Sequence, residues 1–259
     1  VTGPERVATP GDPMEQVNAQ SYKVTQAVDD AVVAPVAKAY KGILPRPIRS
    51  GLRNFVNNLN EPVVFVNYLL QLKPGKAAET LGRFAVNSTV GVAGVFDMAK
   101  RKPFKLPLRR NGFANTMGYY GIKPGPYLYL PLVGPTTVRD LFGLGLDRLL
   151  VPVAVGKPFD RPYYAIPVGV LGSLDYRIEF DDYLRNIRES RDPYAAARET
   201  YLKAREAEIE ALHGRVVPPP VILREEDIPR KADMPEAPAP EAAPPVAAPA
   251  EPAPKPQES

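Results

Sequence analysis

Residues 113–140 read Phe113-Ala-Asn-Thr-Met-Gly-Tyr-Tyr-Gly-Ile-Lys-Pro-Gly-Pro-Tyr-Leu-Tyr-Leu-Pro-Leu-Val-Gly-Pro-Thr-Thr-Val-Arg-Asp140. Glycine, proline and tyrosine occur too densely here for a continuous helix or a central strand, because proline lacks the backbone donor and glycine loosens the backbone. No side chain in the stretch is a nucleophile with a base beside it. The stretch therefore predicts an apolar segment of irregular backbone. We expect it to contribute through its geometry and its amphipathic surface, not through catalysis.

The same stretch carries the motifs of a known family. Gly118-Tyr-Tyr-Gly121, Gly125-Pro-Tyr-Leu-Tyr-Leu-Pro131 and Val138-Arg-Asp140 resemble the MlaA (VacJ) family of outer-membrane lipoproteins. Further matching blocks lie on both sides, and they include Asp12-Pro-Met-Glu-Gln-Val-Asn18, Asn54-Phe-Val-Asn-Asn-Leu-Asn-Glu-Pro62, Gly94-Val-Phe-Asp97 and Ser190-Arg-Asp-Pro-Tyr194. The similarity covers about residues 12–210 in the family's own order.

This resemblance implies both a fold and a function. The implied fold is an all-α, single-domain ring of amphipathic helices, embedded mainly in the inner leaflet of a Gram-negative outer membrane, with a polar passage through its centre. The implied function is phospholipid transport: mislocalised phospholipid leaves the outer leaflet and passes to a periplasmic lipid carrier, beside a porin trimer. Family members usually carry a lipidated cysteine at the mature amino terminus, and this sequence begins at Val1 without any cysteine. We expect either a cysteine upstream of Val1 or a member held in the membrane by its body alone.

The resemblance also points to site residues. It implies a mobile hairpin beside the channel at about residues 107–125. The candidate hairpin residues are Phe113, Met117, Gly118, Tyr119, Tyr120 and Gly121. The two glycines flank the tyrosines and predict hinge movement, and a tyrosine ring with its polar tip suits the headgroup boundary. Asp140 and Lys157 are the candidates for a polar channel wall, although Asp140 could serve only a helix start and Lys157 could be a surface lysine.

Composition divides the chain of 259 residues into a domain and its flanks. We expect a linker over residues 1–11, one helical domain over residues 12–214, and a disordered tail over residues 215–259. The tail holds 13 of the 32 prolines and few large apolar side chains, so it cannot bury enough surface to offset the entropy of ordering. It carries 5 Lys and Arg against 8 Asp and Glu, whereas the rest carries 28 against 21 and has a net charge of +7. A basic body suits anionic headgroups, but on charge alone ordinary solvated lysines and arginines are the better explanation.

Several classes of function are excluded by missing residues. The absence of cysteine rules out thiolate catalysis and cysteine-containing zinc sites, and the single histidine, His213, leaves no support for a metal. Gly-x-Ser-x-Gly and Walker motifs are absent, and the Asp181-Asp182 pair is typical of a solvated surface. We therefore expect no enzyme, no cofactor and no nucleic-acid partner. The competing hypothesis is a periplasmic or outer-membrane scaffold, for which the Pro/Ala-rich tail would be a tether.

The spacing of apolar residues, together with cap residues, prolines and glycines at helix ends, predicts helices along most of the domain. No apolar run reaches the length of about 20 residues that spans a bilayer. Periodicity alone therefore favours a soluble helical core, and the family resemblance favours half-length helices that lie in one leaflet. The first predicted helix starts after Asp12, which should cap it. The others cover residues 31–40, 48–59, 62–72, 74–90, 137–150, 163–188 and 193–212. We expect a kink at Pro167, a cap at Asp192 and a helix end at Gly214.

Overall fold

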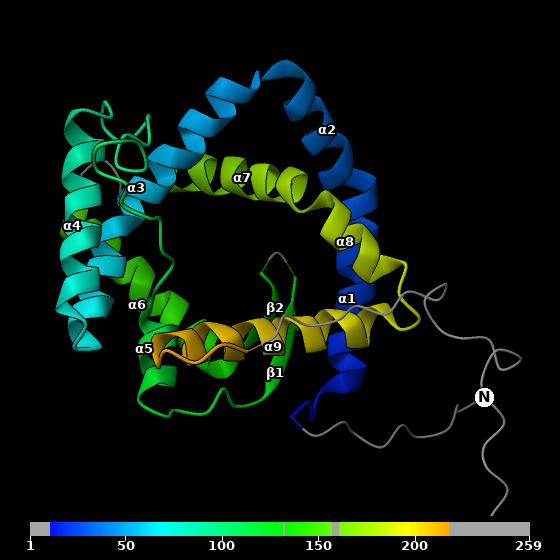
Figure 1. The fold of residues 1–259 in the computed structure, drawn as a ribbon. Coiled ribbons are helices and arrows are strands. Elements are labelled where there is room, and N and C mark those ends of the chain that lie inside the picture. Colours follow the sequence, from blue (N-terminus) through cyan, green and yellow to red (C-terminus); the bar gives the residue numbers. More distant parts are fainter. Residues whose placement is uncertain (1–10, 132, 157–160, 218–259) are drawn as a thin grey trace, which may run out of the picture. The chain divides into compact units, whose positions relative to one another are not determined.

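The structure is a computed structural model that describes residues 11–131, 133–156 and 161–217. The described residues all belong to one compact unit, Val1–Glu225, and most of them are helical (Figure 1). Lys157, the predicted linker before Gly11 and the predicted tail from residue 218 onward lie outside the described residues. The elements are α1 (Glu15–Val28), a π-helical turn η1 (Asp29–Val33), α2 (Ala34–Ile43), α3 (Arg46–Leu70), α4 (Pro74–Thr89), α5 (Phe113–Tyr119), β1 (Tyr127–Leu130), β2 (Gly134–Thr137), α6 (Val138–Val155), α7 (Pro162–Glu179), α8 (Asp181–Arg188) and α9 (Pro193–Leu212).

Three predicted helix boundaries are confirmed by hydrogen bonds. Thr137 precedes α6 and accepts the N–H of Asp140 on its Oγ1 at 3.3 Å. Asp192 precedes α9 and accepts the N–H of Ala195 on its Oδ1 at 3.0 Å. At the far end of α9, the N–H of Arg215 donates to the Glu210 carbonyl at 2.9 Å after Gly214 reverses the chain. These bonds satisfy backbone groups that a helix leaves unpaired at its ends.

The prediction of two helices over residues 48–59 and 62–72 was wrong. They form one helix, α3, with Pro62 inside it. Proline inside a helix removes the hydrogen bond to the carbonyl four residues earlier, and its ring crowds that carbonyl. Packing offsets that loss, because α4 lies beside α3 (Figure 1), Val63 and Val64 are buried, and the buried Glu61 pairs with Arg83 of α4 at 2.8 Å.

The predicted helix over residues 74–90 is confirmed as α4, but the helix does not continue into the apolar run that follows. Val92, Ala93 and Gly94 all adopt positive φ, which ends the helix in a tight turn. Gly94 has φ +90° and lies against α3, where an added Cβ would approach Asn58 Cβ to 2.5 Å. Only glycine fits both the backbone angle and the close approach.

We expect Gly94→Ala to lower the free energy of unfolding by about 2–6 kcal/mol, from about 1–3 kcal/mol of backbone strain and about 1–3 kcal/mol of overpacking. Chemical denaturation followed by circular dichroism measures the change. Gly145→Ala in α6 is the matched control, because an added Cβ there meets nothing within 4 Å. Equal stability of the two variants would show that the turn after α4 yields without strain.

The fold is mostly helical rather than all-α, because one small antiparallel sheet interrupts the helices. Strands β1 and β2 pair from Tyr127 opposite Thr137 to Leu130 opposite Gly134. The alternation Tyr-Leu-Tyr-Leu sends Tyr127 and Tyr129 to one face, where both are buried. The ring of Tyr129 meets that of Tyr22 in α1 at a centroid distance of 5.2 Å, so the sheet packs against α1.

The predicted long helix over residues 163–188 with a kink at Pro167 was wrong in detail. The break lies at Phe180, where φ −102° and ψ 17° separate α7 from α8, and Pro167 lies within α7. The Phe180 ring stacks on Tyr176 with centroids 4.3 Å apart. Asp181 and Asp182 then open α8, where carboxylates favour a helix start.

The alternating charges of residues 193–212 predict a solvated rod with a narrow stripe of Tyr194, Tyr201 and Ile209, and the prediction of a solvated rod was wrong. Tyr194, Ala197, Thr200 and Leu212 on α9 are buried, and Tyr194 packs with Tyr22 and Tyr127 in the largest aromatic cluster of the described residues. The alternating charges of α9 suggested exposure to solvent. Two of the charged residues are arginines that pair with buried acids elsewhere in the fold. The stripe spaces Tyr194, Arg198, Tyr201 and Arg205 at helical intervals.

Among the described residues, no helix combines the length and the apolar character required to cross a membrane. Large apolar side chains nevertheless remain exposed along whole helix faces. On α1, η1 and α2 these are Val17, Val24, Val28, Val32, Val36 and Ile43, and on α6 they are Leu141, Phe142, Leu144 and Leu149. Apolar faces of this extent mark surfaces that contact something other than water.

Candidate functional site

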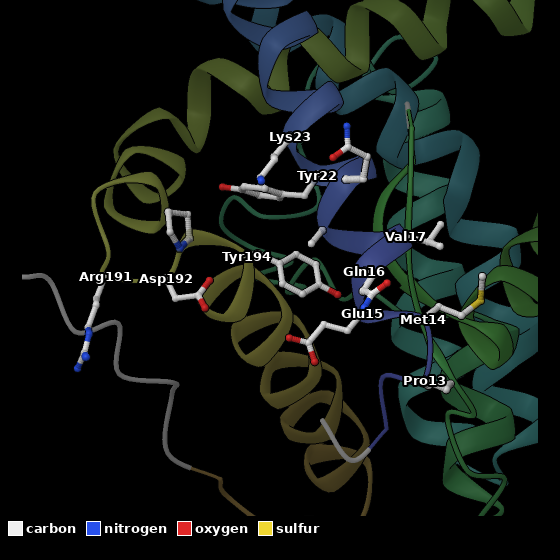
Figure 2. A pocket seen from close by; sticks show the side chains of 13 residues that line it. Pro13, Met14, Glu15, Gln16, Val17, Tyr22, Lys23, Arg191, Asp192 and Tyr194 are labelled. Atoms are coloured by element: carbon white, nitrogen blue, oxygen red, sulfur yellow. The ribbon is translucent and has the colours of Figure 1, made fainter. Parts of the chain in front are cut away.

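A groove of about 1050 Å³ runs between α1 and the start of α9 (Figure 2). Tyr22 and Tyr194 line it together with Met14 and Val17, and charges of both signs, Lys23, Arg191 and Asp192, lie around it. Burial raises the pKa of Tyr22 to about 12, so its hydroxyl stays neutral at physiological pH. The groove offers an amphipathic surface without a nucleophile.

Behind this groove, Asp12 joins the amino-terminal segment to α1 and α9. The side chain of Asp12 is fully buried, and it accepts hydrogen bonds from Asn18 Nδ2 at 2.8 Å, from Arg198 NH1 at 3.0 Å and from the Tyr194 hydroxyl. Asn18 also holds the first strand, since its Nδ2 donates to the Tyr127 carbonyl and its Oδ1 accepts the Tyr129 N–H, both at 3.0 Å. Asp12 was predicted to cap α1, and this was wrong: residue 14 precedes α1 without a side-chain cap.

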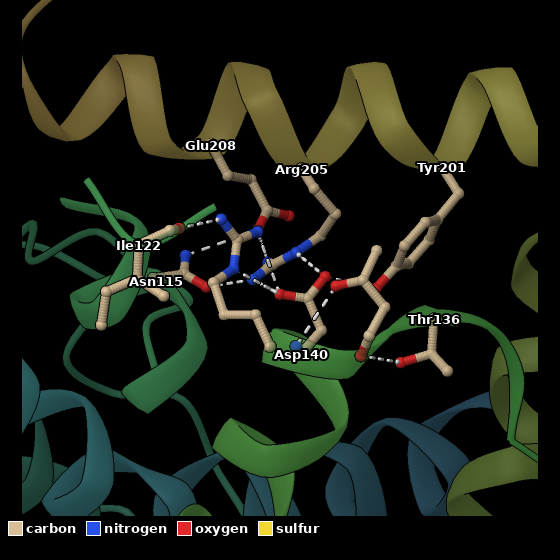
Figure 3. A network of polar contacts seen from close by, with 9 residues as sticks. Asn115, Ile122, Thr136, Asp140, Tyr201, Arg205 and Glu208 are labelled. Carbon is tan, nitrogen blue, oxygen red and sulfur yellow. Dashed lines mark hydrogen bonds and ion pairs between the residues drawn. The ribbon is translucent and has the colours of Figure 1, made fainter. Parts of the chain in front are cut away.

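A second buried network centres on Asp140 in the first turn of α6 (Figure 3). Its Oδ2 accepts from the Tyr201 hydroxyl at 2.6 Å and from Arg205 Nε at 3.1 Å. Its Oδ1 accepts from Nε and NH2 of Arg139, both at 3.1 Å, and from Arg205 NH2 at 3.2 Å. Two guanidinium groups and a phenol therefore surround one carboxylate whose side chain is 7% exposed.

The electrostatics of this cluster keep Asp140 ionised. Burial raises the pKa of Asp140, but the hydrogen bond and charge of Arg205, the Tyr201 hydroxyl and the charge of Arg139 outweigh it and lower the pKa below its usual value. Burial and the Asp140 carboxylate together raise the pKa of Tyr201. Neither group exchanges a proton near neutral pH, so the cluster positions chain segments and carries no acid–base chemistry.

The Asp140 cluster fastens the predicted hairpin at two points. Arg205 NH2 donates to Asn115 Oδ1 in α5 at 2.7 Å, and Arg139 NH1 donates to the Ile122 carbonyl after α5 at 3.2 Å (Figure 3). Each guanidinium thus bonds Asp140 and the hairpin at the same time. Asp140 is therefore the shared anchor of α5 and of the chain segment that follows it.

Other contacts tie the hairpin to α3 and α6. The Phe113 N–H donates to Asp147 Oδ1 at 3.0 Å, and the Thr116 hydroxyl donates to Asn67 Oδ1 at 2.6 Å. Thr116 Oγ1 accepts from Gln71 Nε2 at 2.8 Å. These bonds hold residues at the start and middle of α5, whereas the bonds from Arg139 and Arg205 reach its middle and its end.

The structure brings most of the predicted hairpin residues into this region. Phe113 and Met117 are half-buried in α5, Tyr119 stacks on His213 with ring centroids 4.5 Å apart, and the 59% exposed Tyr120 donates its hydroxyl to the Leu70 carbonyl. Gly121 is exposed with φ +84°, which suits a turn at the end of the hairpin helix. Lys157 lies outside the described residues, so its predicted place in a channel wall stays a prediction.

Gly118 has a different role from the predicted hinge. It is helical and buried, and an added Cβ would lie 2.4 Å from Cδ1 of Ile209 in α9. A side chain here would push α5 away from α9. Gly118 therefore permits close packing of the hairpin on α9, and the freedom of the backbone belongs to Gly121.

Sequence reasoning missed the two arginines of α9. Arg198 and Arg205 stand seven residues apart on one helix face, each beside a tyrosine of that face, and each neutralises one buried acid. The signal was the spacing of Tyr194, Arg198, Tyr201 and Arg205, which places four polar-tipped side chains on one stripe. The alternating charges on either side of this stripe indicated a helix that is exposed to solvent on all sides.

The pH dependence of stability tests the Asp140 cluster. Because the pKa of Asp140 is lowered on folding, its stabilisation is fully present above its unfolded value of about 3.9 and is lost as pH falls through the lowered folded value. We expect Asp140→Asn to be strongly destabilised relative to wild type at neutral pH, with the gap closing progressively below about pH 4. Urea unfolding across this range measures the gap.

Asp182→Asn is the matched control, since the Asp182 side chain is 85% exposed and, among the residues that the structure describes, pairs with Arg185 alone. It should leave stability close to that of wild type at each pH. A gap for Asp140→Asn that stayed constant down to about pH 2 would contradict the assigned charge state.

The chain is similar in sequence to known proteins. The family model of the MlaA lipoprotein matches residues 10–208. The intermembrane phospholipid transport system lipoprotein MlaA of Escherichia coli is 35% identical over 201 residues, which cover 74% of this chain and 76% of that protein. The protein of the same name from Haemophilus influenzae is 34% identical over 203 residues, covering 76% and 78%, and an uncharacterized protein of Rickettsia felis is 33% identical over 204 residues, covering 77% and 78%.

Three-dimensional similarity agrees with the sequence. A solved structure from work on the structural basis for maintenance of bacterial outer membrane lipid asymmetry superposes with a TM-score of 0.69 at 29% identity, covering 76% of this chain and 98% of that one. The expected resemblance is thereby confirmed at the level of both the sequence and the fold. The chain belongs to the MlaA lipoprotein family.

Proposed function

We propose that this chain transports phospholipid to maintain the lipid asymmetry of a Gram-negative outer membrane. It removes mislocalised phospholipid from the outer leaflet and passes it to a periplasmic lipid carrier. Family membership over residues 10–208 supports this role, since the relatives from Escherichia coli and Haemophilus influenzae are named as lipoproteins of an intermembrane phospholipid transport system.

The observation that carries the proposal is the distribution of polarity. Exposed apolar stripes follow α1, α2 and α6, while ionised side chains such as Asp12, Arg83 and Asp140 are buried. A water-soluble domain of this size usually does the reverse. Helices that expose an apolar face along their length suit a body that lies in one leaflet.

A ring of such helices in the inner leaflet, open at its centre, explains how a lipid could change leaflets. A phospholipid moves slowly between leaflets because burying an unpartnered polar group in hydrocarbon costs roughly 2–7 kcal/mol, and a charge costs more. A central polar channel supplies partners for the headgroup. The direction then follows from the geometry of the ring and from the carrier, without nucleotide hydrolysis.

The hairpin of residues 107–125 is the proposed gate of that channel. Its helix α5 packs on α9 through Gly118, its outer tyrosine Tyr120 is exposed, and Gly121 provides a turn of unusual backbone angle. Asp140 acts on the gate through Arg139 and Arg205, and its low exposure leaves little of the side chain to line a passage. Lys157 remains a candidate for the channel wall.

The proposed partners are an outer-membrane porin trimer and the periplasmic carrier. The apolar faces of α1, α2 and α6 offer contact surface for membrane lipid or for a porin wall. The competing scaffold hypothesis needs no channel and no lipid contact. Membrane fractionation separates the two, because a scaffold should be released by a high-salt wash, whereas a body seated in the leaflet should be retained.

A clean deletion tests the function in cells. We expect phospholipid to accumulate in the outer leaflet and the cells to become sensitive to detergent with chelator, and we expect the wild-type chain to restore both. Outer-leaflet phospholipid is measured by a labelling reagent or a phospholipase that acts only on exposed lipid. Unchanged outer-leaflet phospholipid in the deletion strain would refute lipid removal.

A further inference from the structure

A second cavity, of about 300 Å³, lies between α2, α3 and α7 and contains no member of the Asp140 cluster or of α5. One part of its lining is apolar and comes from Leu52, Phe55 and Val56 of α3 and from Leu171, Tyr176 and Phe180 at and near α7. The rest is charged. A cavity of this size, mostly apolar with a few placed polar groups, is typical of a site for a small ligand or a headgroup.

The charged part joins α3 to α7. Arg53 Nε lies 2.6 Å from Asp175 Oδ2, and Arg53 NH1 lies 2.5 Å from Glu179 Oε2. Arg49, which is 7% exposed, donates its Nε to the Leu44 carbonyl at 3.1 Å. Asp175 thus has one oxygen firmly bound by Arg53.

The other oxygen of Asp175 has no hydrogen-bond partner within the part of the chain that the structure describes. Arg49 NH1 lies 3.7 Å from Asp175 Oδ1, which is within reach of an ion pair but too long for a hydrogen bond. The Tyr40 hydroxyl, also in the cavity lining, is buried without a partner as well. Buried polar atoms normally have partners, so this pair of atoms is suited to a ligand that donates hydrogen bonds.

Arg110 adds a positive charge to the same cavity. It lies just before the hairpin helix, lines the cavity and is exposed, and within the described ranges it makes no ion pair or hydrogen bond. Burial raises the pKa of Tyr176, while Arg110 lowers it and Glu179 raises it, so both charged groups lie near this ring. The cavity therefore presents an unpaired cation and an unsatisfied carboxylate oxygen beside an apolar wall.

We propose that this cavity binds the zwitterionic headgroup of a phospholipid that carries a primary amine. The ammonium group donates to Asp175 Oδ1 and to the Tyr40 oxygen, the phosphate pairs with Arg110, and the glycerol and first chain carbons lie on the apolar wall. A trimethylammonium headgroup cannot donate these hydrogen bonds, and a glycerol headgroup brings no positive charge to Asp175. The site therefore makes the chain selective for amine-bearing phospholipid, an inference that rests on the proposed function.

The test compares headgroups on the full chain in detergent micelles. Water-soluble dihexanoyl phospholipids with ethanolamine, choline or glycerol headgroups are titrated by calorimetry, and we expect the ethanolamine form to bind at least tenfold more tightly than the other two. Asp175→Asn should lose this preference. Equal affinity for all three headgroups in the wild-type chain would overturn the proposal.

Glycine positions on α7 give a pair of variants that leaves the charges intact. Gly172 lines the cavity and an added Cβ there meets nothing within 4 Å, so Gly172→Leu should fold and fill the site. Gly169 is equally open and does not line the cavity, which makes Gly169→Leu the matched control. We expect Gly172→Leu to lose ethanolamine-headgroup binding at least tenfold and Gly169→Leu to keep it. Unchanged binding in a folded Gly172→Leu protein would place the lipid elsewhere and refute this site.

The same data separate this site from the general function. If the deletion strain shows outer-leaflet phospholipid but the headgroups bind equally, transport stands and the selective site is refuted. If the selective binding is found and deletion leaves the outer leaflet unchanged, the site stands and the transport proposal is refuted.

Discussion

Joining residues 118 and 209 by a disulfide is expected to abolish the removal of phospholipid from the outer leaflet. The chain has no cysteine, so Gly118→Cys with Ile209→Cys gives a single pair. An added Cβ at residue 118 would lie 2.9 Å from Cγ1 of Ile209, which is bonded to the Ile209 Cβ, so the two β-carbons lie close to the separation of about 3.5–4.5 Å that a disulfide uses. Ile209→Cys also removes the Cδ1 atom that a side chain at residue 118 would meet. The bond would fix α5 on α9 and prevent the proposed gate from opening.

Reduction and a second cysteine pair control this experiment. Outer-leaflet phospholipid in cells should rise to the level of the deletion strain when the pair is oxidised, and should fall again on reduction. Gly51→Cys with Val95→Cys is the matched pair, because an added Cβ at residue 51 would lie 3.1 Å from Val95 Cγ1 and both residues lie outside the hairpin. It should crosslink without effect on the lipid. Full activity in a quantitatively crosslinked 118–209 protein would mean that the hairpin is a packed loop and no gate.

Arg205→Met is expected to cause the largest loss of stability among single substitutions of the Asp140 cluster. Arg205 bonds both oxygens of Asp140 and also Asn115 and Glu208, and its side chain is only 17% exposed. Removing one partner of a buried ion pair costs about 3–5 kcal/mol, and we expect the lower part of this range because Arg139 still bonds Asp140 Oδ1. Denaturant unfolding measures the loss, and outer-leaflet phospholipid should also rise, since one fastening of the hairpin is gone.

Two further variants identify the cause of that loss. Lys203→Met removes the exposed pair with Glu199 on the same helix, and exposed pairs of this spacing contribute only about 0.3–0.5 kcal/mol. Asp140→Leu combined with Arg205→Met removes both partners of one interaction and should cost less stability than the two single variants added together, while the buried Arg139 keeps its hydrogen bond to the Ile122 carbonyl. A double variant as unstable as the sum of the singles would show that the two residues do not act as a pair.

Local sequence rules predicted the helix ends well. The cap residues Thr137 and Asp192 and the stop at Gly214 follow from short-range chemistry that needs no tertiary context. The mostly helical fold and the family also followed from motifs, since residues 113–140 keep their characteristic glycines and tyrosines.

The failures arose where partners are distant in sequence. Pro62 predicted a helix start. In the structure, α3 continues past Pro62, stabilised by packing on α4 and by the Glu61–Arg83 pair. Asp12 reads as a cap, yet its partners Tyr194 and Arg198 lie more than 180 residues away. Gly118 reads as a hinge, and only the position of Ile209 shows that it is a packing position. None of these contacts leaves a trace in local propensity.

The most direct test of lipid transport is the transfer of bound lipid. The full chain is extracted from outer membranes, its co-purified lipids are quantified by mass spectrometry, and the measurement is repeated after the periplasmic carrier has been added and removed. We predict that phospholipid co-purifies with the chain and moves to the carrier, and that the oxidised 118–209 disulfide variant retains it. A chain that carries no phospholipid, or one whose phospholipid never reaches the carrier, would contradict the proposed function.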